Sequence, residues 1–524
     1  MLQSDKINLF YIPYPNVTML YLMRKYTFHF ILAFIFLSCK QPSKQENAFA
    51  SAAFTSLAKY PAKALQGDFD LLVNSLKEGH TGIYCYTTAK SFDSLVAAQR
   101  AMIQDSMNGF QFYNIVSPIV AATKEDHCDI NLSDELKGFL RQQGKFMPLS
   151  VLNSGDDTFI LNDTISGQSF KGARIIAING MPVQTIKEKI YRTFGSDGNI
   201  LSSKIAFLEG IKLAIEYAKV IGQPESFDMT VMNPSNGSQQ TVSVKSVTFD
   251  ALKTIETRVN STYYRDADMP PASFEYLDGN TARLTFNTFS NSRFRKQNMN
   301  FRAFTDSCFN ILFKDKPEIL IIDMRENGGG SEGNEDYLFS WLTDQPYIKY
   351  DSVELSRFTF SFINHTDYAA DSDRIALYKE LREENELTEH GRILRKKGIY
   401  TPTPPRANSF KGHLYILTSA WTYSGGAEFC SLVREHTNAV FVGQETGGGY
   451  YGNTSGVMLE LTLPVTKLSI SIPILKFNLA VHKGIPGHGV IPDFEVKPSF
   501  DSFSKGIDQE LDKTLSITPA VEVR

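Results

Sequence analysis

The feature that most constrains the fold is a set of short, continuously apolar segments in the second half of the chain, separated by stretches with helical spacing. The clearest is EILIIDM at residues 318–324. An apolar run of this length is typical of a strand buried on both faces. Further strands are predicted at residues 282–289, 413–418 and 439–442, and helices at 301–313, 336–342 and 426–436. Buried strands that alternate with helices predict an α/β core built on a mainly parallel sheet.

Two regions with other patterns precede this core, which we place at residues 265–515. Apolar residues recur at helical spacing up to about Leu140, which predicts a helical N-terminal region over residues 40–144. Residues 145–250 instead show short strands separated by Gly, Asn and Asp. Within the core, residues 350–405 are polar and charged, and we interpret them as an inserted surface segment.

The N-terminus has the pattern of an export signal. After Met23, two basic residues precede a short apolar run that ends just before Cys39. This run is too short for a membrane-spanning helix. The end of the run resembles a bacterial lipobox, although Phe36 occupies the usual Leu position. The resemblance implies a signal over residues 1–39, with Met23 as a second candidate start, a lipid on Cys39 and anchoring at the cell envelope; a plain cleaved signal is the alternative.

Composition and cysteine spacing exclude several classes of function. The chain has 53 basic and 57 acidic residues and a net charge of -4, so it lacks the basic footprint of a nucleic-acid-binding protein. Apart from Cys39, the cysteines are scattered without a CxxC pair, so no metal site or disulfide framework is predicted. We expect no cofactor, and the sequence carries no signal for an oligomeric state.

A glycine-rich turn follows the apolar strand at residues 318–324. Residues 323–330 read DMRENGGG. Such a turn directs backbone N–H groups into a shared cavity, as in phosphate loops and oxyanion holes. Residues 331–336 contain three acids and no Lys, which disfavours a phosphate loop.

A second glycine-rich turn surrounds Ser424 in TYSGGAEF, residues 422–429. A Ser on a strand-to-helix turn exposes its hydroxyl, and the N–H groups at the helix start can stabilise an oxyanion. The alternative is that Ser424 only caps the helix, a frequent function of Ser at this position.

The combination of motifs resembles the C-terminal-processing, or tail-specific, serine peptidase family. Its elements are D-x-R-x-N-x-G-G at 323–330, T-x-S-x-x-x-E at 422–428, V-G-x-x-T-x-G at 442–448 and GVIPD at 489–493. Upstream, GARIIAING at 172–180 resembles the strand and Asn-Gly turn of PDZ domains, with an unrelated hairpin as the alternative. The likeness spans most of residues 145–515.

The resemblance implies a crotonase/ClpP-like catalytic core, a PDZ-like β-rich domain and a helical N-terminal region. It makes Ser424 the nucleophile of a serine-type endopeptidase that hydrolyses exported or envelope polypeptides through an acyl-enzyme. The oxyanion hole would combine the N–H of Gly329 or Gly330 with that of Gly425.

The general base departs from the lysine-dependent branch of this family. Gly449 occupies the position where that branch has its Lys, while Lys467 and Lys476 carry no supporting motif. Histidine suits proton transfer near neutral pH. His127 in KEDHC and His80 in KEGHTG both resemble the D-G-H-T element of the tricorn-like and retinoid-binding-protein-like branches, where this His is the base. His80 fits the letters better, but His127 fits the position better and is our expectation.

The acid that orients this His is the least defined part of the site. The tricorn-like branch has a Glu where this chain has Pro486. Glu445 and Glu428 are candidates because they lie near the motifs. Two rival functions remain: an inactive relative that binds peptides or apolar ligands, and a scaffold lipoprotein whose PDZ-like unit recruits chain termini by strand addition.

Overall fold

The computed structural model describes residues 57–518, except 163–166, 168, 235, 264–268 and 397. The predicted signal, residues 1–39 with Cys39, lies outside the described residues, as does Met23. No helix in the described part of the chain is both long enough and apolar enough to span a membrane.

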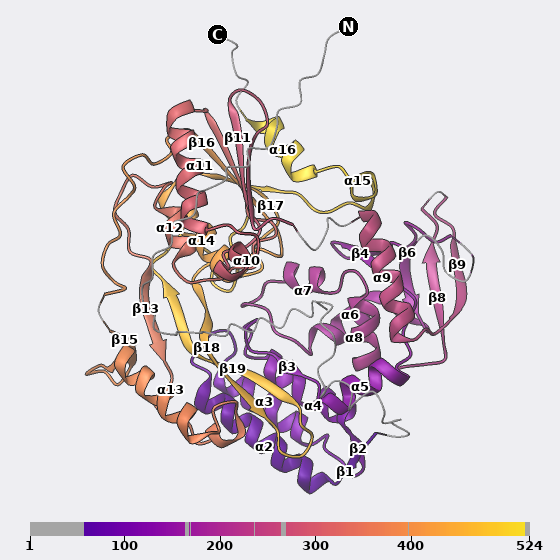
Figure 1. Cartoon of the computed structure of the whole chain (residues 1–524). Helices are drawn as coiled ribbons and strands as arrows, with labels where there is room; N and C mark the ends of the chain where they lie inside the picture. The colour runs from indigo at the N-terminus through magenta and orange to yellow at the C-terminus, as the bar shows by residue number, and fades with distance from the viewer. Residues whose placement is uncertain are drawn as a thin grey trace. The chain divides into compact units, whose positions relative to one another are not determined.

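The N-terminal region is helical, as predicted (Figure 1). It contains a two-stranded antiparallel sheet of β1 (Lys59–Tyr60) and β2 (Met107–Asn108), and the helices α2 (Ala62–Gly79), α3 (Ala89–Arg100), α4 (Gly109–Ala121) and α5 (Asp134–Gln143). The helical spacing buries Phe69, Leu72 and Leu76 on one face of α2, which packs on β19. A capping box at Asn108 begins α4.

Residues 145–263 form an antiparallel sheet with helices against it. The strand order is β4-β5-β6-β8-β9, with β7 paired to β6. The strands are β4 (Val151–Ser154), β5 (Asp157–Ile160), β6 (Arg174–Ile178), β7 (Met181–Pro182), β8 (Ser226–Met232) and β9 (Gln239–Lys245); the helices are α6 (Val183–Tyr191), α7 (Ser202–Phe207), α8 (Lys212–Val220) and α9 (Phe249–Tyr263). Asn179 and Gly180 both have positive φ, which confirms the predicted Asn-Gly turn between β6 and β7.

The predicted parallel sheet is present in the core. Its order is β10-β11-β12-β16-β17-β20, and all of its pairs are parallel except β10 with β11. The strands are β10 (Ala272–Tyr276), β11 (Thr281–Phe286), β12 (Ile319–Asp323), β16 (His413–Thr418), β17 (Val440–Gly443) and β20 (Phe494–Glu495). The helices are α10 (Asn291–Lys296), α11 (Phe301–Asp315), α12 (Asn334–Phe339), α14 (Gly425–His436), α15 (Phe500–Lys505) and α16 (Gln509–Ile517).

The continuous apolar run of β12 is explained by cover on both faces of this sheet. Leu320 and Ile322 join the main hydrophobic core, whereas Ile319 and Ile321 pack in a separate cluster that includes Leu511 of α16. Adjacent residues of a strand point to opposite faces, so both sets must be apolar.

A third sheet includes strands from the segment 350–405. Its order is β14-β15-β13-β19-β18, and β3 also pairs with β19. The strands are β3 (Ile130–Asn131), β13 (Tyr350–Leu355), β14 (Asn385–Leu387), β15 (Ile393–Arg395), β18 (Gly452–Thr462) and β19 (Ser469–Leu479). The segment also contains the 3-10 turn η1 (Ile363–His365) and helix α13 (Asp371–Glu384). Because β13 is paired with β19 and α13 buries Leu377 and Leu381, this segment is part of the fold despite its charge.

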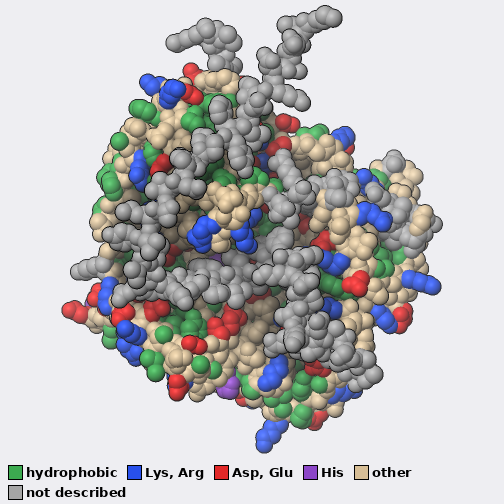
Figure 2. Space-filling view, viewed as in Figure 1, with side chains coloured by type: hydrophobic (Ala, Val, Ile, Leu, Met, Phe, Trp, Pro, Cys, Tyr) green, Lys and Arg blue, Asp and Glu red, His purple; other side chains and the backbone are tan. Residues whose placement is uncertain are grey.

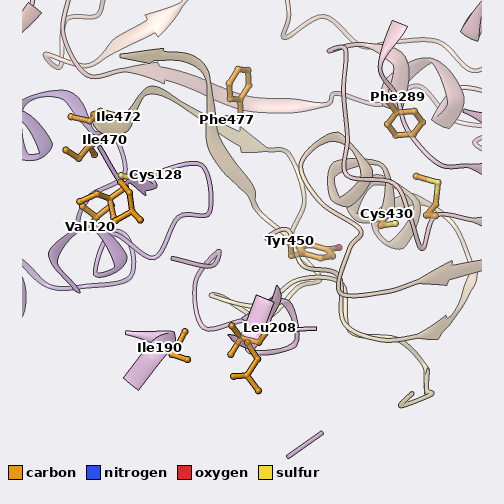
Figure 3. Packing of buried hydrophobic residues seen from close by; sticks show 14 of the residues in the cluster. Val120, Cys128, Ile190, Leu208, Phe289, Cys430, Tyr450, Ile470, Ile472 and Phe477 are labelled. Carbon is orange, nitrogen blue, oxygen red and sulfur yellow. The ribbon is translucent and has the colours of Figure 1, made fainter. Parts of the chain in front are cut away.

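The hydrophobic core continues from the N-terminal helices into the parallel sheet. In Figure 3, Cys128 lies beside Val120, Ile470 and Ile472, so it packs the loop after α4 against β19. Phe289 and Cys430, also labelled there, belong to the same cluster, and the Phe289 ring packs on that of Phe429 in α14, with centroids 6.2 Å apart. On the face shown in Figure 2, acidic, basic and hydrophobic side chains are interspersed.

Candidate active site

Ser424 lies on a sharp turn between β16 and α14, as the motif predicted. Its backbone has φ 48° and ψ -127°, a conformation that residues with a side chain rarely adopt. Such strain costs on the order of 1–3 kcal/mol and persists only where neighbouring contacts impose it. Here the Tyr423 N–H donates to the Asn327 carbonyl at 3.0 Å, and the Thr422 hydroxyl donates to the Met324 carbonyl at 2.9 Å. These two hydrogen bonds hold the two glycine-rich turns together.

The hydroxyl of Ser424 does not cap the helix. Ser424 precedes α14, but its side chain makes no capping hydrogen bond. Ser133 gives the contrast within the same molecule: it has φ -62° and its side chain accepts from the Leu136 N–H of α5. A capping Ser needs this extended backbone, which Ser424 lacks. The helix-cap alternative for Ser424 is therefore not realised, and its half-exposed hydroxyl is free to react.

The first glycine-rich turn packs directly on Ser424. A side chain at Gly329 would place its Cβ 2.8 Å from the Ser424 Cβ, so only Gly fits. The Gly329 N–H donates to Asn327 Oδ1 at 2.9 Å and is already used. Within the described residues, the N–H groups of Gly330 and Gly425 have no hydrogen-bond partner. Gly330 with Gly425 is thus the pair of donors that the turns leave available for an oxyanion.

A buried ionic cluster lies under the start of α14. The Lys349 ammonium contacts Glu335 and is 2.9 Å from Glu428 Oε2. Burial acts to lower the pKa of Lys349, but the two carboxylates hold that pKa well above its usual value. Lys349 therefore stays protonated and cannot act as a base. Elsewhere in the described chain, no group of three or more His, Cys, Asp and Glu side chains is placed to hold a metal ion.

His127 lies in the loop between α4 and β3, half-buried. Burial lowers the pKa of its imidazole, and the carboxylates of Asp197 and Glu428 oppose this shift. Glu428 is one helical turn beyond Ser424 on α14, so His127 faces the helix that Ser424 begins. A lowered pKa keeps the imidazole neutral at neutral pH, which is the form that a general base requires.

His80 has a different environment. It follows α2, is only 3% exposed, and its Nδ1 accepts from the Gly82 N–H at 3.1 Å. Burial lowers the pKa of His80 to about 3, and the positive charge of Lys476 adds to the effect. These contacts are typical of a structural histidine that stays neutral.

The lysine candidates lie on the β18–β19 hairpin. Lys467 is exposed in the turn between the two strands, and the Lys476 ammonium contacts the Cys85 sulfur. Gly449, at the position of the Lys in the lysine-dependent branch, donates its N–H to Asp197 Oδ2 at 3.0 Å.

Both candidate acids have partners other than His127 as their nearest polar contacts. Glu445 Oε1 is 2.9 Å from His488 Nδ1 and accepts from the Gly489 N–H. Glu428 binds Lys349 and accepts from Asn453 Nδ2 at 3.0 Å.

Two buried polar residues near the site were not given a function by the sequence analysis. Asn327 is fully buried, and it holds both Gly329 and Tyr423 in place. Its position in the D-x-R-x-N motif was the only signal for it. Asp197 contacts the His127 loop and Gly449, but it lies far from both in sequence and belongs to no motif.

Comparisons with known proteins give one family match and several solved structures of similar fold. Residues 280–496 match the family model of peptidase family S41. The solved structure of mature CPAF matches with a TM-score of 0.55 and 15% identity, over 86% of this chain and 97% of that chain. Mature CPAF complexed with lactacystin matches with a TM-score of 0.57 and 14% identity, over 86% and 98%. No curated protein matches the sequence. At these identities the structural likeness shows the fold alone, and the similarity to peptidase family S41 is carried by residues 280–496.

Proposed function

We propose that this protein is a serine endopeptidase that cleaves exported or envelope polypeptides through an acyl-enzyme at Ser424. In the first step His127 takes the hydroxyl proton as Ser424 Oγ bonds to the peptide carbonyl carbon. The N–H groups of Gly330 and Gly425 donate to the oxyanion that forms. The C–N bond then breaks, and the leaving amine takes the proton from His127. Water, activated by the same His, hydrolyses the ester and frees Ser424.

The observation that carries this proposal is the Ser424 turn. In the part of the chain that the structure describes, a positive φ and an uncapped hydroxyl at Ser424 lie beside two glycine N–H groups that have no hydrogen-bond partner, as an activated serine next to an oxyanion hole requires. An inactive binding protein would have no reason to retain backbone strain at this residue.

A fluorophosphonate probe tests the proposal, since it forms a covalent bond only with an activated serine. We expect labelling and peptide hydrolysis in the wild type, and loss of both by several orders of magnitude in Ser424→Ala. The circular dichroism spectrum of the variant should match that of the wild type. Hydrolysis that persists in folded Ser424→Ala would rule out Ser424 as the nucleophile.

The finer parts of the proposal concern recruitment and location. We infer that residues 145–250 act as a PDZ-like domain that binds substrate chains by strand addition beside a crotonase/ClpP-like core. A lipid on Cys39 would hold the enzyme at the envelope, as a periplasmic or outer-membrane lipoprotein. Mass spectrometry of the membrane fraction should find a lipidated Cys39 as the mature N-terminus; an unmodified N-terminus downstream of it would contradict the anchor.

A further inference from the structure

The loop at residues 195–199, between α6 and α7, contacts both parts of the chain that contribute to the candidate active site, the N-terminal region and the peptidase core. The Gly198 N–H donates to the Lys124 carbonyl at 2.9 Å, in the loop that carries His127. A Cβ at Gly195 would lie 2.6 Å from the Glu125 carbonyl oxygen, so the two loops are in direct backbone contact. The Asn199 N–H donates to the Gly487 carbonyl at 2.7 Å. The loop therefore lies between the N-terminal region and the peptidase core.

Asp197 is the charged residue at the centre of this loop, and it is 2% exposed. Its Oδ1 accepts from the N–H of Asp126, the residue before His127, at 2.9 Å. Its Oδ2 accepts from the N–H of Gly449 at 3.0 Å. One carboxylate therefore fixes the backbone beside His127 to the turn that follows β17.

That turn packs on Ser424. A Cβ at Gly448 would lie 3.0 Å from the Ser424 N, and the Gly448 N–H donates to the Thr422 carbonyl at 3.1 Å. Gly448 and Gly449 are consecutive, so only these two residues lie between the Asp197 carboxylate and the Ser424 turn. Asp197 thus sets the distance between the loop that carries His127 and the turn that carries Ser424.

The charges of Asp197 and His127 also act on each other. Burial raises the pKa of Asp197, and His127 followed by the two N–H donors opposes that rise. Asp197 is the strongest of the charges that raise the pKa of His127 against burial. Both Asp197 oxygens accept from N–H groups, which favours the ionised form. Within the described residues, His127 Nδ1 is buried without a hydrogen-bond partner, so neither Asp197 nor any other group holds the ring by a hydrogen bond to that atom.

We propose that Asp197 is the positioning residue for His127, holding its loop against the Ser424 turn and stabilising the imidazolium that forms when Ser424 gives up its proton. This inference rests on the proposed function. Asp197 would replace the acid that is missing at Pro486, although it comes from a different part of the chain. A carboxylate that stabilises an imidazolium acts mainly in the transition state and so changes kcat more than KM.

The test compares Asp197→Asn with a matched control, Asp68→Asn. Asp68 is also fully buried and accepts from two backbone N–H groups, those of Val465 at 3.1 Å and Thr466 at 2.7 Å, but it joins α2 to the β18–β19 turn. Both substitutions remove one buried carboxylate of the same kind. We expect kcat to fall on the order of 10²-fold in Asp197→Asn with little change in KM.

The pH dependence separates a positioning function from a structural one. Loss of the Asp197 charge lowers the pKa of His127, so the acid limb of the kcat profile moves to lower pH in Asp197→Asn and stays in place in Asp68→Asn. The titratable groups facing these two residues are Glu428, Glu125, Asp126, Tyr86 and Tyr423. Burial raises the pKa of Glu125 to about 8, so its titration falls on the alkaline side and does not produce the acid limb.

Three results would overturn the inference while leaving Ser424 as nucleophile. One is an unmoved acid limb in folded Asp197→Asn, and another is an equal shift in Asp68→Asn. The third comes from Asp197→Glu, which keeps the charge and is expected to keep the acid limb near its wild-type position; a shift as large as that in Asp197→Asn would exclude an electrostatic effect. Failure of the proposed function itself is seen separately, as hydrolysis by Ser424→Ala.

Discussion

The segments that carry His80 and His127 have similar sequences, but the two histidines lie in different electrostatic environments. Residues 77–80 read KEGH and end α2, whereas residues 124–127 read KEDH and lie in the loop after α4. His80 is 3% exposed and its strongest charged neighbour is the cation Lys476. His127 is half-buried and faces two anions, Asp197 and Glu428.

The difference shows that the environment, rather than the local letters, determines which histidine can take a proton. A cation beside a buried imidazole makes protonation more costly, whereas an anion stabilises the imidazolium. His80 also uses its Nδ1 to bind the Gly82 N–H of its own loop. His127 is therefore the residue of the two whose surroundings suit a general base.

The largest expected effect is that of His127→Ala on hydrolysis. We expect kcat to fall on the order of 10²–10⁴-fold, because proton transfer from Ser424 loses its acceptor. The double variant with Ser424→Ala should be little worse than either single variant, since members of one catalytic unit are not additive. Steady-state hydrolysis of a fluorogenic peptide measures all three.

The matched control for this comparison is His80→Asn, in which the amide oxygen can still accept from the Gly82 N–H. It should retain hydrolysis, as should Lys467→Ala and Lys476→Ala on the β18–β19 hairpin. If His80→Asn is inactive and His127→Ala is active, the two loops have exchanged functions. If only a lysine variant is inactive, the base belongs to the lysine-dependent branch.

The sequence predicted those parts of the fold and site that depend on local pattern. The strand at residues 318–324 and the Ser424 turn are predicted because a buried strand and a tight turn each require a characteristic pattern of a few consecutive residues. The sequence does not indicate that the segment 350–405 contributes to a sheet, because the partner of β13 is β19, which lies far along the chain. The charged residues of α13 make its two buried residues, Leu377 and Leu381, hard to recognise from the sequence.

The positioning function that we propose for Asp197 could not be predicted from the sequence for the same reason. The candidates near the motifs are Glu445 and Glu428, whose nearest polar partners in the structure include His488 and Lys349. Asp197 stands in a short loop, in the segment FGSDGN, with nothing to distinguish it from an ordinary turn residue. Only the fold brings it between Asp126 and Gly449.

The smallest expected effect concerns the free energy of unfolding rather than the rate of hydrolysis. The pKa of His80 is about 3 in the folded protein, against about 6.5 in an unfolded chain. Between these values the unfolded chain binds a proton that the folded protein does not, so the free energy of unfolding falls as the pH falls below about 6.5. From pH 7 to pH 5 this linkage amounts to about 2 kcal/mol for His80, at roughly 1.4 kcal/mol per pH unit. Urea unfolding at pH 7 and pH 5 should therefore show that the free energy of unfolding falls less in His80→Asn than in the wild type. In His127→Ala, which keeps His80, the part of this fall that His80 contributes should remain. An equal loss in His80→Asn and wild type would mean that His80 is protonated in the folded protein, and the contrast between the two loops would then be wrong.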